Sequence, residues 1–234
     1  AEQLKFTITI CGSYNMGKPD IIYEDNDIIV CYKPAGIATQ TRRIGQQDME
    51  SFIRNYRAAK NEPPYVGIVH RLDQPVEGVM VFAKNQKAAA SLSRQIKEHT
   101  TEKYYRAASR GHGVSGADKK EDNHDPAWHT LTDYISFDKR TNTSKITSEK
   151  DRLAKKAVLQ YRILSNECNK TEFDIKLLTG RHHQIRLQLA NIGYPLIGDT
   201  KYGGETAREQ LALCSYKIVF DHPATGERLT FELP

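Results

Sequence analysis

The sequence has no apolar stretch long enough to cross a membrane, and it contains only four cysteines. Its N-terminus, AEQLKFTITI, lacks the basic start and the long apolar run of a secretory signal. The cysteines, at positions 11, 31, 168 and 214, form no C-x-x-C pair and have no histidine at a zinc-finger spacing. These absences argue against a membrane protein, a disulfide framework and a structural zinc site. They predict a cytoplasmic protein with reduced cysteines.

Several motifs of nucleotide-dependent and metal-dependent enzymes are also missing. The chain has no P-loop, no dinucleotide fingerprint between a strand and a helix, no G-x-S-x-G elbow and no H-E-x-x-H pair. The sequence therefore predicts a site that contains no metal and no organic cofactor.

The chain does contain enough apolar residues for a core and a moderate excess of positive charge. Hydrophobic residues make up 38% of the 234 residues, which favours a globular protein. The formal net charge of +5 permits a polyanionic partner, although a single basic cluster is more typical of a solvated surface. The basic residues gather at Lys33, Arg42, Arg43, Arg54 and Arg57, along residues 94–110 and 139–156, and at Arg181 and Arg186.

Hydrophobic periodicity predicts many strands and few helices. Two β-branched runs around an Asp-Asn turn, in residues 21–36, predict a hairpin, and residues 85–99 predict a helix with Asn85 as its N-cap. Residues 183–193 predict a second helix that ends at a glycine, whereas residues 111–126 are too polar to pack and are expected to be exposed. Further strands are expected at residues 78–84, 103–109, 129–137, 157–165, 171–178, 211–220 and 228–233. Because most links are hairpins, we expect an α+β fold on a central mixed or antiparallel β-sheet.

An aspartate in the stretch GIVHRLDQPVEG, residues 67–78, has more than one interpretation. Asp73 stands directly before a Gln-Pro turn signal, where aspartate is ordinary turn chemistry. Arg71 favours another interpretation, because a buried aspartate that a cation keeps ionised is a usable nucleophile or base. The pair can also be purely structural. Tyr104 and Tyr105 alternate in a later strand, so one can face the core and the other a cleft.

A second polar group opens the helix expected from residue 183. The stretch TGRHHQIR brings Arg181, His182, His183 and Arg186 within about one helical turn. A helix N-terminus with two arginines favours an anion such as phosphate, but the histidines can equally cap the helix while the arginines face water. A metal is less favoured, since no carboxylate or third histidine stands at a standard ligand spacing nearby.

Taken in order, these residues resemble the RluA-type RNA pseudouridine synthases. HRLD followed by VFAK is similar to the catalytic motif of that family, and GRHHQIRLQLANIGYPLIGDTKYG is similar to its C-terminal signature. Similarities also occur in IIYEDNDIIVCYKPAGI, in K-x-Y-x-A from Lys103 to Ala107, in KKAVLQYRIL, and in the last 24 residues. The resemblance covers nearly everything after residue 20, which makes a simple turn role for Asp73 improbable.

The resemblance implies a central mixed sheet with helices and loops around a basic cleft. Asp73 would be the catalytic aspartate, Tyr105 would lie against the target base, and Arg186 would pair with the aspartate. Arg71 would help to hold the flipped nucleotide or its backbone. The residues expected to contact RNA are Arg71, Arg181, His183 and Lys33.

The implied reaction converts uridine in structured RNA, ribosomal or transfer RNA, to pseudouridine without a cofactor. The carboxylate either attacks the sugar or removes a sugar proton, and the sequence does not choose between these routes. The target uridine must leave its stack, which favours a loop or bulge. We expect a monomer that acts on neither DNA nor a membrane. Residues 1–20 would be a short N-terminal segment and residues 21–234 the catalytic domain, with no separate N-terminal RNA-binding module.

The chain departs from the family pattern at two places, and two other functions compete. Val76 and Glu77 stand where the family usually has Thr-Ser, and the added negative charge disfavours a nearby phosphate. His182 replaces a common threonine. The first competing function is an RNA-binding or RNA-folding protein that keeps the cleft without turnover. The second is a phosphodiester-cleaving enzyme that uses His182 and His183 as acid and base.

Overall fold

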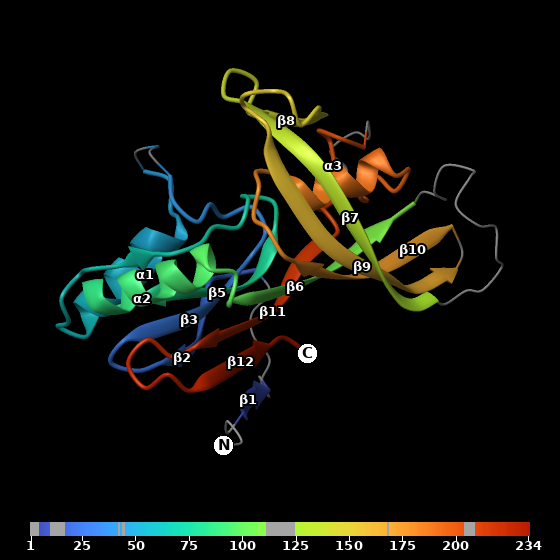
Figure 1. The fold of residues 1–234 in the computed structure, drawn as a ribbon. Helices are drawn as coiled ribbons and strands as arrows, with labels where there is room; N and C mark the ends of the chain where they lie inside the picture. The colour runs from blue at the N-terminus through green and yellow to red at the C-terminus, as the bar shows by residue number, and fades with distance from the viewer. Residues whose placement is uncertain are drawn as a thin grey trace. The chain divides into compact units, whose positions relative to one another are not determined.

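The computed structural model describes residues 5–9, 17–41, 43, 45–110, 125–167, 169–203 and 209–234. The chain folds into two compact units (Figure 1). Unit 1 comprises Ala1–Glu102 and Ser215–Pro234, and unit 2 comprises Lys103–Cys214. Across the described residues, no helix has the length and apolar character needed to span a membrane.

Unit 1 is built on a mixed β-sheet. Its strands follow the order β2, β3, β5 and β11, while β12 pairs with β11 and, in parallel, with β1, and the short β4 pairs with β5. The two central strands β3 and β5 are almost completely buried, as their near-continuous apolar runs predict for strands covered on both faces. The strands are β1 Lys5–Thr9, β2 Asp20–Glu24, β3 Ile28–Lys33, β4 Gly67–Ile68, β5 Glu77–Ala83, β11 Leu213–Asp221, which starts in unit 2, and β12 Arg228–Glu232.

Two helices belong to this unit. The helix α2, Gln86–Lys97, confirms the sequence prediction: the Asn85 side chain accepts a hydrogen bond from Ala88 N and thereby caps it. The helix α1, Met49–Ala59, was not expected from the sequence. It begins with a capping box, in which Asp48 and Ser51 each accept from the backbone amide of the other.

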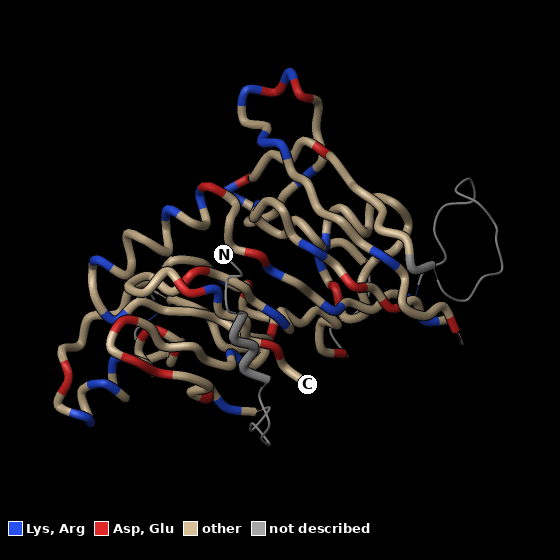
Figure 2. Tube along the Cα trace, turned by 60° about the horizontal axis from the view of Figure 1, so that its bottom comes forward, with Lys and Arg blue, Asp and Glu red and all other residues tan. Residues whose placement is uncertain are grey.

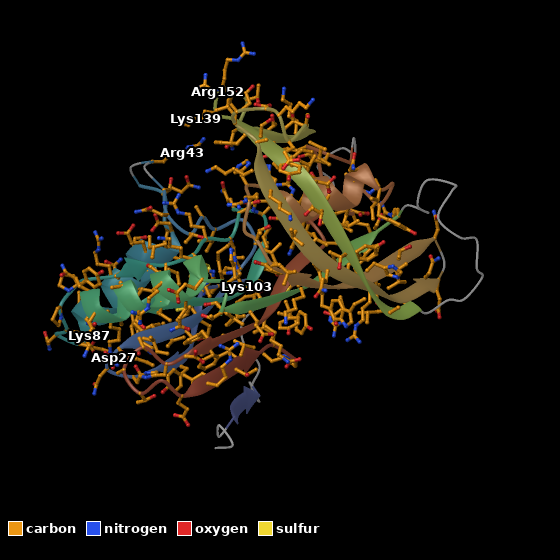
Figure 3. The ribbon with its side chains drawn as sticks, in the orientation of Figure 1. Asp27, Arg43, Lys87, Lys103, Lys139 and Arg152 are labelled. Atoms are coloured by element: carbon orange, nitrogen blue, oxygen red, sulfur yellow. The ribbon has the colours of Figure 1, made fainter. Side chains whose placement is uncertain are left out.

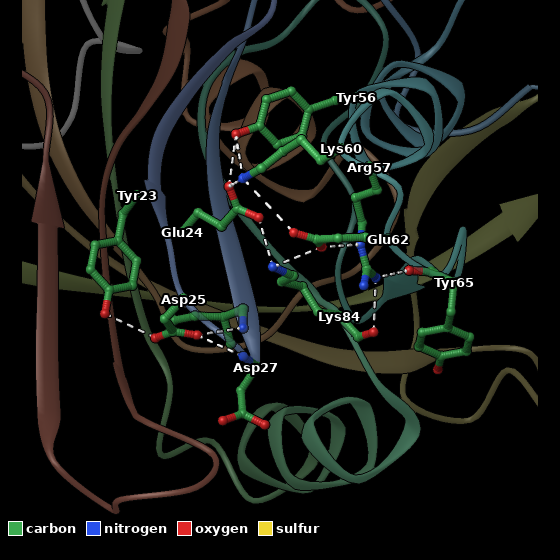
Figure 4. A network of polar contacts seen from close by, with 11 residues as sticks. Tyr23, Glu24, Asp25, Asp27, Tyr56, Arg57, Lys60, Glu62, Tyr65 and Lys84 are labelled. Carbon is green, nitrogen blue, oxygen red and sulfur yellow. Dashed lines mark hydrogen bonds and ion pairs between the residues drawn. The ribbon is translucent and has the colours of Figure 1, made fainter.

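Arg57, at the end of α1, corrects the expectation that the basic clusters are solvated surface. Its side chain is buried. The guanidinium pairs with Glu62 at 3.1 Å and donates to the backbone carbonyl groups of Tyr65 and Lys84 (Figure 4). Arg57 therefore fastens the link that follows α1 to the end of β5, whereas its neighbour Arg54 is exposed.

Unit 2 is an antiparallel sheet with one helix. The strand order is β6, β10, β9, β7 and β8, and every neighbouring pair is antiparallel. The helix α3, Gln184–Asn191, contacts β7 and β8. The strands are β6 Glu102–Ser109, which starts in unit 1, β7 Asp125–Asp138, β8 Thr143–Thr147, β9 Lys155–Glu167 and β10 Lys170–Leu177.

Most sequence predictions for unit 2 are confirmed. The strands β7, β9 and β10 are antiparallel neighbours, and α3 is followed by Gly193 with φ of 87°. The short polar strand β8 was missed. The expected exposed stretch at 111–126 lies mostly outside the described residues, as do Cys11 and Cys168.

Candidate active site

Asp73 lies in unit 1, in the link between β4 and β5, and its side chain is half-buried. The expected turn is present: the backbone carbonyl of Asp73 accepts from Val76 N at 3.0 Å, with Gln74 and Pro75 between them. Three residues before Asp73 in the chain, the imidazole Nε2 of His70 accepts a hydrogen bond from Val81 N of β5 at 3.1 Å. The turn that carries the carboxylate is therefore tied to a central strand of the sheet.

Lys33 ends the neighbouring strand β3 and lies inside unit 1. Its side chain is 0% exposed, and its ammonium donates to the carbonyl oxygens of Pro34, Ile37 and Gln74 at 3.0, 2.6 and 3.2 Å. Burial lowers the pKa of Lys33 to about 8, while the carboxylates of Asp73 and Glu77 oppose that change. The expected contact of Lys33 with RNA stays a prediction, and this burial disfavours it.

The other charged residues near the turn are placed differently. Arg71 is exposed, and its Nη2 donates to the Gln40 side-chain oxygen at 3.4 Å, so its guanidinium is accessible to a ligand. Glu77, one of the departures from the family pattern, accepts from the Tyr32 hydroxyl at 2.8 Å. This bond holds the additional carboxylate toward β3.

Tyr105 and Tyr104 divide between the two faces of β6 in unit 2. Tyr105 is 5% exposed and pairs with the buried Ile175 of β10. Tyr104 is half-buried and has the ammonium of Lys176 over its ring, 5.3 Å from the centroid. The expected alternation is confirmed, with Tyr105 on the buried face.

Arg186, in the first turn of α3, forms a buried ion pair that the sequence did not reveal. Its Nε donates to Asp199 Oδ2 at 2.8 Å and its Nη2 to Asp199 Oδ1 at 2.7 Å. Asp199 is 0% exposed and also accepts from the backbone amides of Lys201 and Tyr202. Burial alone would raise the pKa of Asp199, but the hydrogen bonds and charge of Arg186 outweigh it and lower that pKa. The only sequence signal was the position of Asp199 in GDTKYG of the second signature.

The histidine pair is enclosed by side chains of unit 2. The rings of His182 and His183 lie 3.7 Å apart, and His183 Nδ1 is 2.8 Å from the Tyr202 hydroxyl. His183 has φ of 54° and makes no side-chain cap for α3. Burial, followed by the charge of Arg186, lowers the pKa of His183 to about 3, so a neutral imidazole is present at physiological pH. Both the capping interpretation and the acid-base interpretation lose support, and burial disfavours the RNA contact expected of His183.

A metal site receives little support from the described residues. Among them, the only group with suitable geometry is Asp25, Asp27 and His222 in unit 1. The Asp25 carboxylate already accepts from the Tyr23 hydroxyl, from His222 Nε2 and from the backbone amides of Asp27 and Ile28. These donors explain the cluster as a link between two turns.

Positive charge is spread along both units and interleaved with acidic positions (Figure 2). Lys139 and Arg152 extend outward from the links on either side of β8, and Arg43 from the link before α1 (Figure 3). Arg181 is half-buried, and its Nε donates to the carbonyl of Lys156 at 2.9 Å. Lys139, Arg152 and Arg43 are exposed cations of the kind that bind phosphate, although none forms a site alone.

Comparison with solved structures identifies the fold. The human RNA pseudouridylate synthase domain containing 4 aligns with a TM-score of 0.69 at 21% identity, over 90% of this chain and 86% of that chain. The human RNA pseudouridylate synthase domain containing 1 aligns with a TM-score of 0.69 at 22% identity, over 95% and 86%. The expected α+β fold on a mixed sheet is therefore confirmed.

Sequence comparison extends the likeness to a family. The sequence profile described as RNA pseudouridylate synthase matches residues 27–191. An uncharacterized RNA pseudouridine synthase of Bacillus subtilis (strain 168) is 33% identical in an alignment 222 positions long, which covers 93% of this chain and 69% of that protein. The ribosomal large subunit pseudouridine synthase D of Vibrio cholerae is 33% identical in an alignment 236 positions long, which covers 92% of this chain and 67% of that protein. These matches agree with the resemblance of the motifs, and the chain belongs to the RNA pseudouridylate synthase family of isomerases.

Proposed function

We propose that the protein isomerises uridines of structured RNA to pseudouridine with Asp73 as the catalytic carboxylate. The observation that carries this proposal is the placement of Asp73 in a turn that the core of unit 1 holds, beside the buried ammonium of Lys33. A nearby cation that solvent does not screen favours the ionised form of a half-buried carboxylate. Asp73 is therefore supported as a residue that is negatively charged when the substrate binds.

The chemistry requires a carboxylate and no redox partner. The C1′–N1 bond of the uridine breaks, a C1′–C5 bond forms, N1 gains a proton and C5 loses one, so that the product is an isomer. Asp73 would either attack the sugar and form a covalent intermediate, or remove a sugar proton so that the base leaves. Both routes use the ionised carboxylate, and neither needs a cofactor.

The remaining roles follow from the family resemblance and belong to the same proposal. The ring of Tyr105 would stack on the target uracil and assist proton removal from C5, a role that requires this nearly buried ring to become accessible when RNA binds. The Asp199 carboxylate would hold Arg186 in the orientation that its role requires. Arg71 and Arg181 would bind the RNA backbone. Since several relatives are named as synthases of the large ribosomal subunit, we propose ribosomal RNA ahead of transfer RNA.

Pseudouridine mapping on defined transcripts tests the proposal. The purified protein and its Asp73→Asn variant are incubated with in vitro transcripts of large-subunit ribosomal RNA and of transfer RNAs, and carbodiimide treatment locates pseudouridine. We expect modified uridines with the wild-type protein, none with Asp73→Asn, and similar RNA affinity for both. The exposed Asp138→Asn variant is the matched control and should retain activity. Tight RNA binding without any pseudouridine from the wild-type protein would instead favour an RNA-binding protein without turnover.

A further inference from the structure

The Thr39 hydroxyl makes two hydrogen bonds to the residue that precedes Asp73. Thr39 Oγ1 donates to the carbonyl of Leu72 at 2.9 Å and accepts from the amide of Leu72 at 3.1 Å. Thr39 and Leu72 are buried, at 3% and 6% exposed. Buried backbone groups need partners, and here one side chain supplies both partners, as a neighbouring strand otherwise would.

The residue after Asp73 is fixed by the same segment of the chain. The carbonyl of Gln74 accepts from Gly36 N at 2.8 Å and from the Lys33 ammonium at 3.2 Å. The side-chain amide of Gln74 donates back to the carbonyl of Gly36 at 2.9 Å. The segment from Lys33 to Thr39 therefore bonds to both sequence neighbours of Asp73.

Thr39 is itself held by other parts of unit 1. Its carbonyl accepts from Glu50 N at 3.2 Å, in the first turn of α1, and the preceding carbonyl, of Ala38, accepts from Met49 N at 3.0 Å. Its hydroxyl also lies 3.8 Å from the Met80 sulfur of β5. A β-branched side chain has few rotamers, so a threonine fixed at its backbone presents its hydroxyl in a defined direction.

We infer that Thr39 is a positioning residue, which sets the place of the Asp73 carboxylate by holding Leu72 through its hydroxyl. This inference rests on the proposed role of Asp73. Without the hydroxyl, the buried amide and carbonyl of Leu72 lose their partners. Because unsatisfied buried polar groups cost free energy, the turn is then expected to shift so that water can reach them. A displacement of about 1 Å at a reacting group is enough to slow catalysis by about 100-fold.

Two substitutions separate the hydroxyl from the shape of the side chain. Thr39→Val keeps the branched shape and removes the hydroxyl, whereas Thr39→Ser keeps the hydroxyl and removes the methyl group. The measured quantities are the single-turnover rate of pseudouridine formation and the dissociation constant for the same transcript. We expect Thr39→Val to lower the rate by about 10-fold to 100-fold with affinity within about twofold, and Thr39→Ser to stay within about threefold in both. Wild-type rate in Thr39→Val, or equal losses in the two variants, would overturn the inference.

Amide hydrogen exchange gives a readout that does not depend on turnover. The Leu72 amide should exchange faster in Thr39→Val than in the wild-type protein, and Thr39→Ser should restore its protection. The Ala88 amide at the start of α2 serves as the internal reference, because its partner is Asn85. Unchanged protection of Leu72 in Thr39→Val would overturn the inference even if the enzyme is active. Altered protection in a protein that forms no pseudouridine would support the bond while the proposed function fails.

Discussion

The Arg186 guanidinium and the Asp199 carboxylate form a two-point ion pair inside unit 2, with both contacts shorter than 3 Å. The pair has consequences for charge as well as geometry. Asp199 neutralises much of the charge that Arg186 would offer to another carboxylate, and the two parallel bonds fix the plane of the guanidinium. Within unit 1, the buried ammonium of Lys33 interacts electrostatically with the Asp73 carboxylate.

Asp199→Ala should destabilise unit 2 strongly. The substitution leaves the buried Arg186 charge without this partner and removes the acceptor of the Lys201 and Tyr202 amides. Breaking a buried pair in this way costs about 3–5 kcal/mol, and urea unfolding measures it. Glu209→Ala is the control, because Glu209 forms an exposed ion pair with Arg110. This substitution should change the free energy of unfolding by less than about 1 kcal/mol. Equal effects of the two variants would contradict the buried-pair interpretation.

His183 should make the protein less stable as the pH falls below neutrality. Its pKa in the folded state is about 3 and its ordinary pKa is 6.5, so the unfolded chain binds a proton that the folded chain does not. The contribution of the neutral His183 side chain to the free energy of unfolding is fully present above pH 6.5 and is lost progressively as the pH falls from 6.5 toward 3. Between pH 6.5 and 5 we expect a loss of about 1–2 kcal/mol in urea unfolding.

The matching substitutions for this prediction are His183→Asn and His99→Asn. Both histidines have positive φ, 54° and 59°, a conformation that asparagine tolerates, and His99 is exposed. His183→Asn should flatten the decline between pH 6.5 and 5, while His99→Asn should leave it unchanged. An imidazole signal of His183 that titrates near pH 6.5 in NMR would contradict the prediction.

Glu24 should support stability in a more acidic window. Its carboxylate accepts from Lys60, Lys84 and the Tyr56 hydroxyl (Figure 4). Burial acts to raise its pKa, but these bonds outweigh burial and lower the pKa to about 2. The contribution of ionised Glu24 to the free energy of unfolding is therefore present above pH 4.5 and is lost as the pH falls from 4.5 to 2. Glu24→Gln should cost on the order of 2 kcal/mol at pH 7 and nearly nothing at pH 2, with the exposed Glu98→Gln as control. If the free energies of unfolding of Glu24→Gln and the wild-type protein differ by the same amount at every pH, the predicted role of the Glu24 charge is wrong.

Much of the fold follows from local pattern, because the pattern and the structure depend on the same short-range physics. The apolar runs of β3 and β5 predict buried strands, and Asn85 predicts the start of α2. The strand β8, TSKIT, has too few apolar residues for such a signal. The helix α1 did carry one, since Asp48 and Ser51 stand three residues apart as its capping box requires.

The site is less accessible to this reasoning. Asp73 and Arg186 were found through the resemblance of whole motifs, whereas Asp199 is a single acid without periodicity. Lysine usually lies on the surface, and the burial of Lys33 depends on backbone carbonyl groups that include that of Gln74, 41 residues away. Thr39 likewise bonds to Leu72 across 33 residues. Contacts of this range arise from the tertiary fold and leave no mark on local sequence.

Gly78, five residues after Asp73, should tolerate no side chain. It has φ of 135°, and a Cβ placed there would lie 2.3 Å from the carbonyl oxygen of Ser215 and 2.6 Å from its nitrogen. The backbone of β11, which neighbours β5 in the sheet, therefore lies very close to this position, and only glycine permits that approach. Gly78→Ala must displace a central strand, so we expect a loss of at least about 3 kcal/mol in urea unfolding or failure to fold.

Gly226, in the turn between β11 and β12, is the control site that distinguishes backbone strain from a steric clash of the added Cβ. It also has positive φ, 75°, but a Cβ there would meet nothing within 4 Å. Gly226→Ala should therefore cost only the strain of the left-handed conformation, about 1–2 kcal/mol. If the two variants lost the same free energy, the close approach of Ser215 would not explain the glycine at position 78. If Gly78→Ala is the more damaging, the glycine that follows HRLD allows the close approach of β11 to β5 in the sheet.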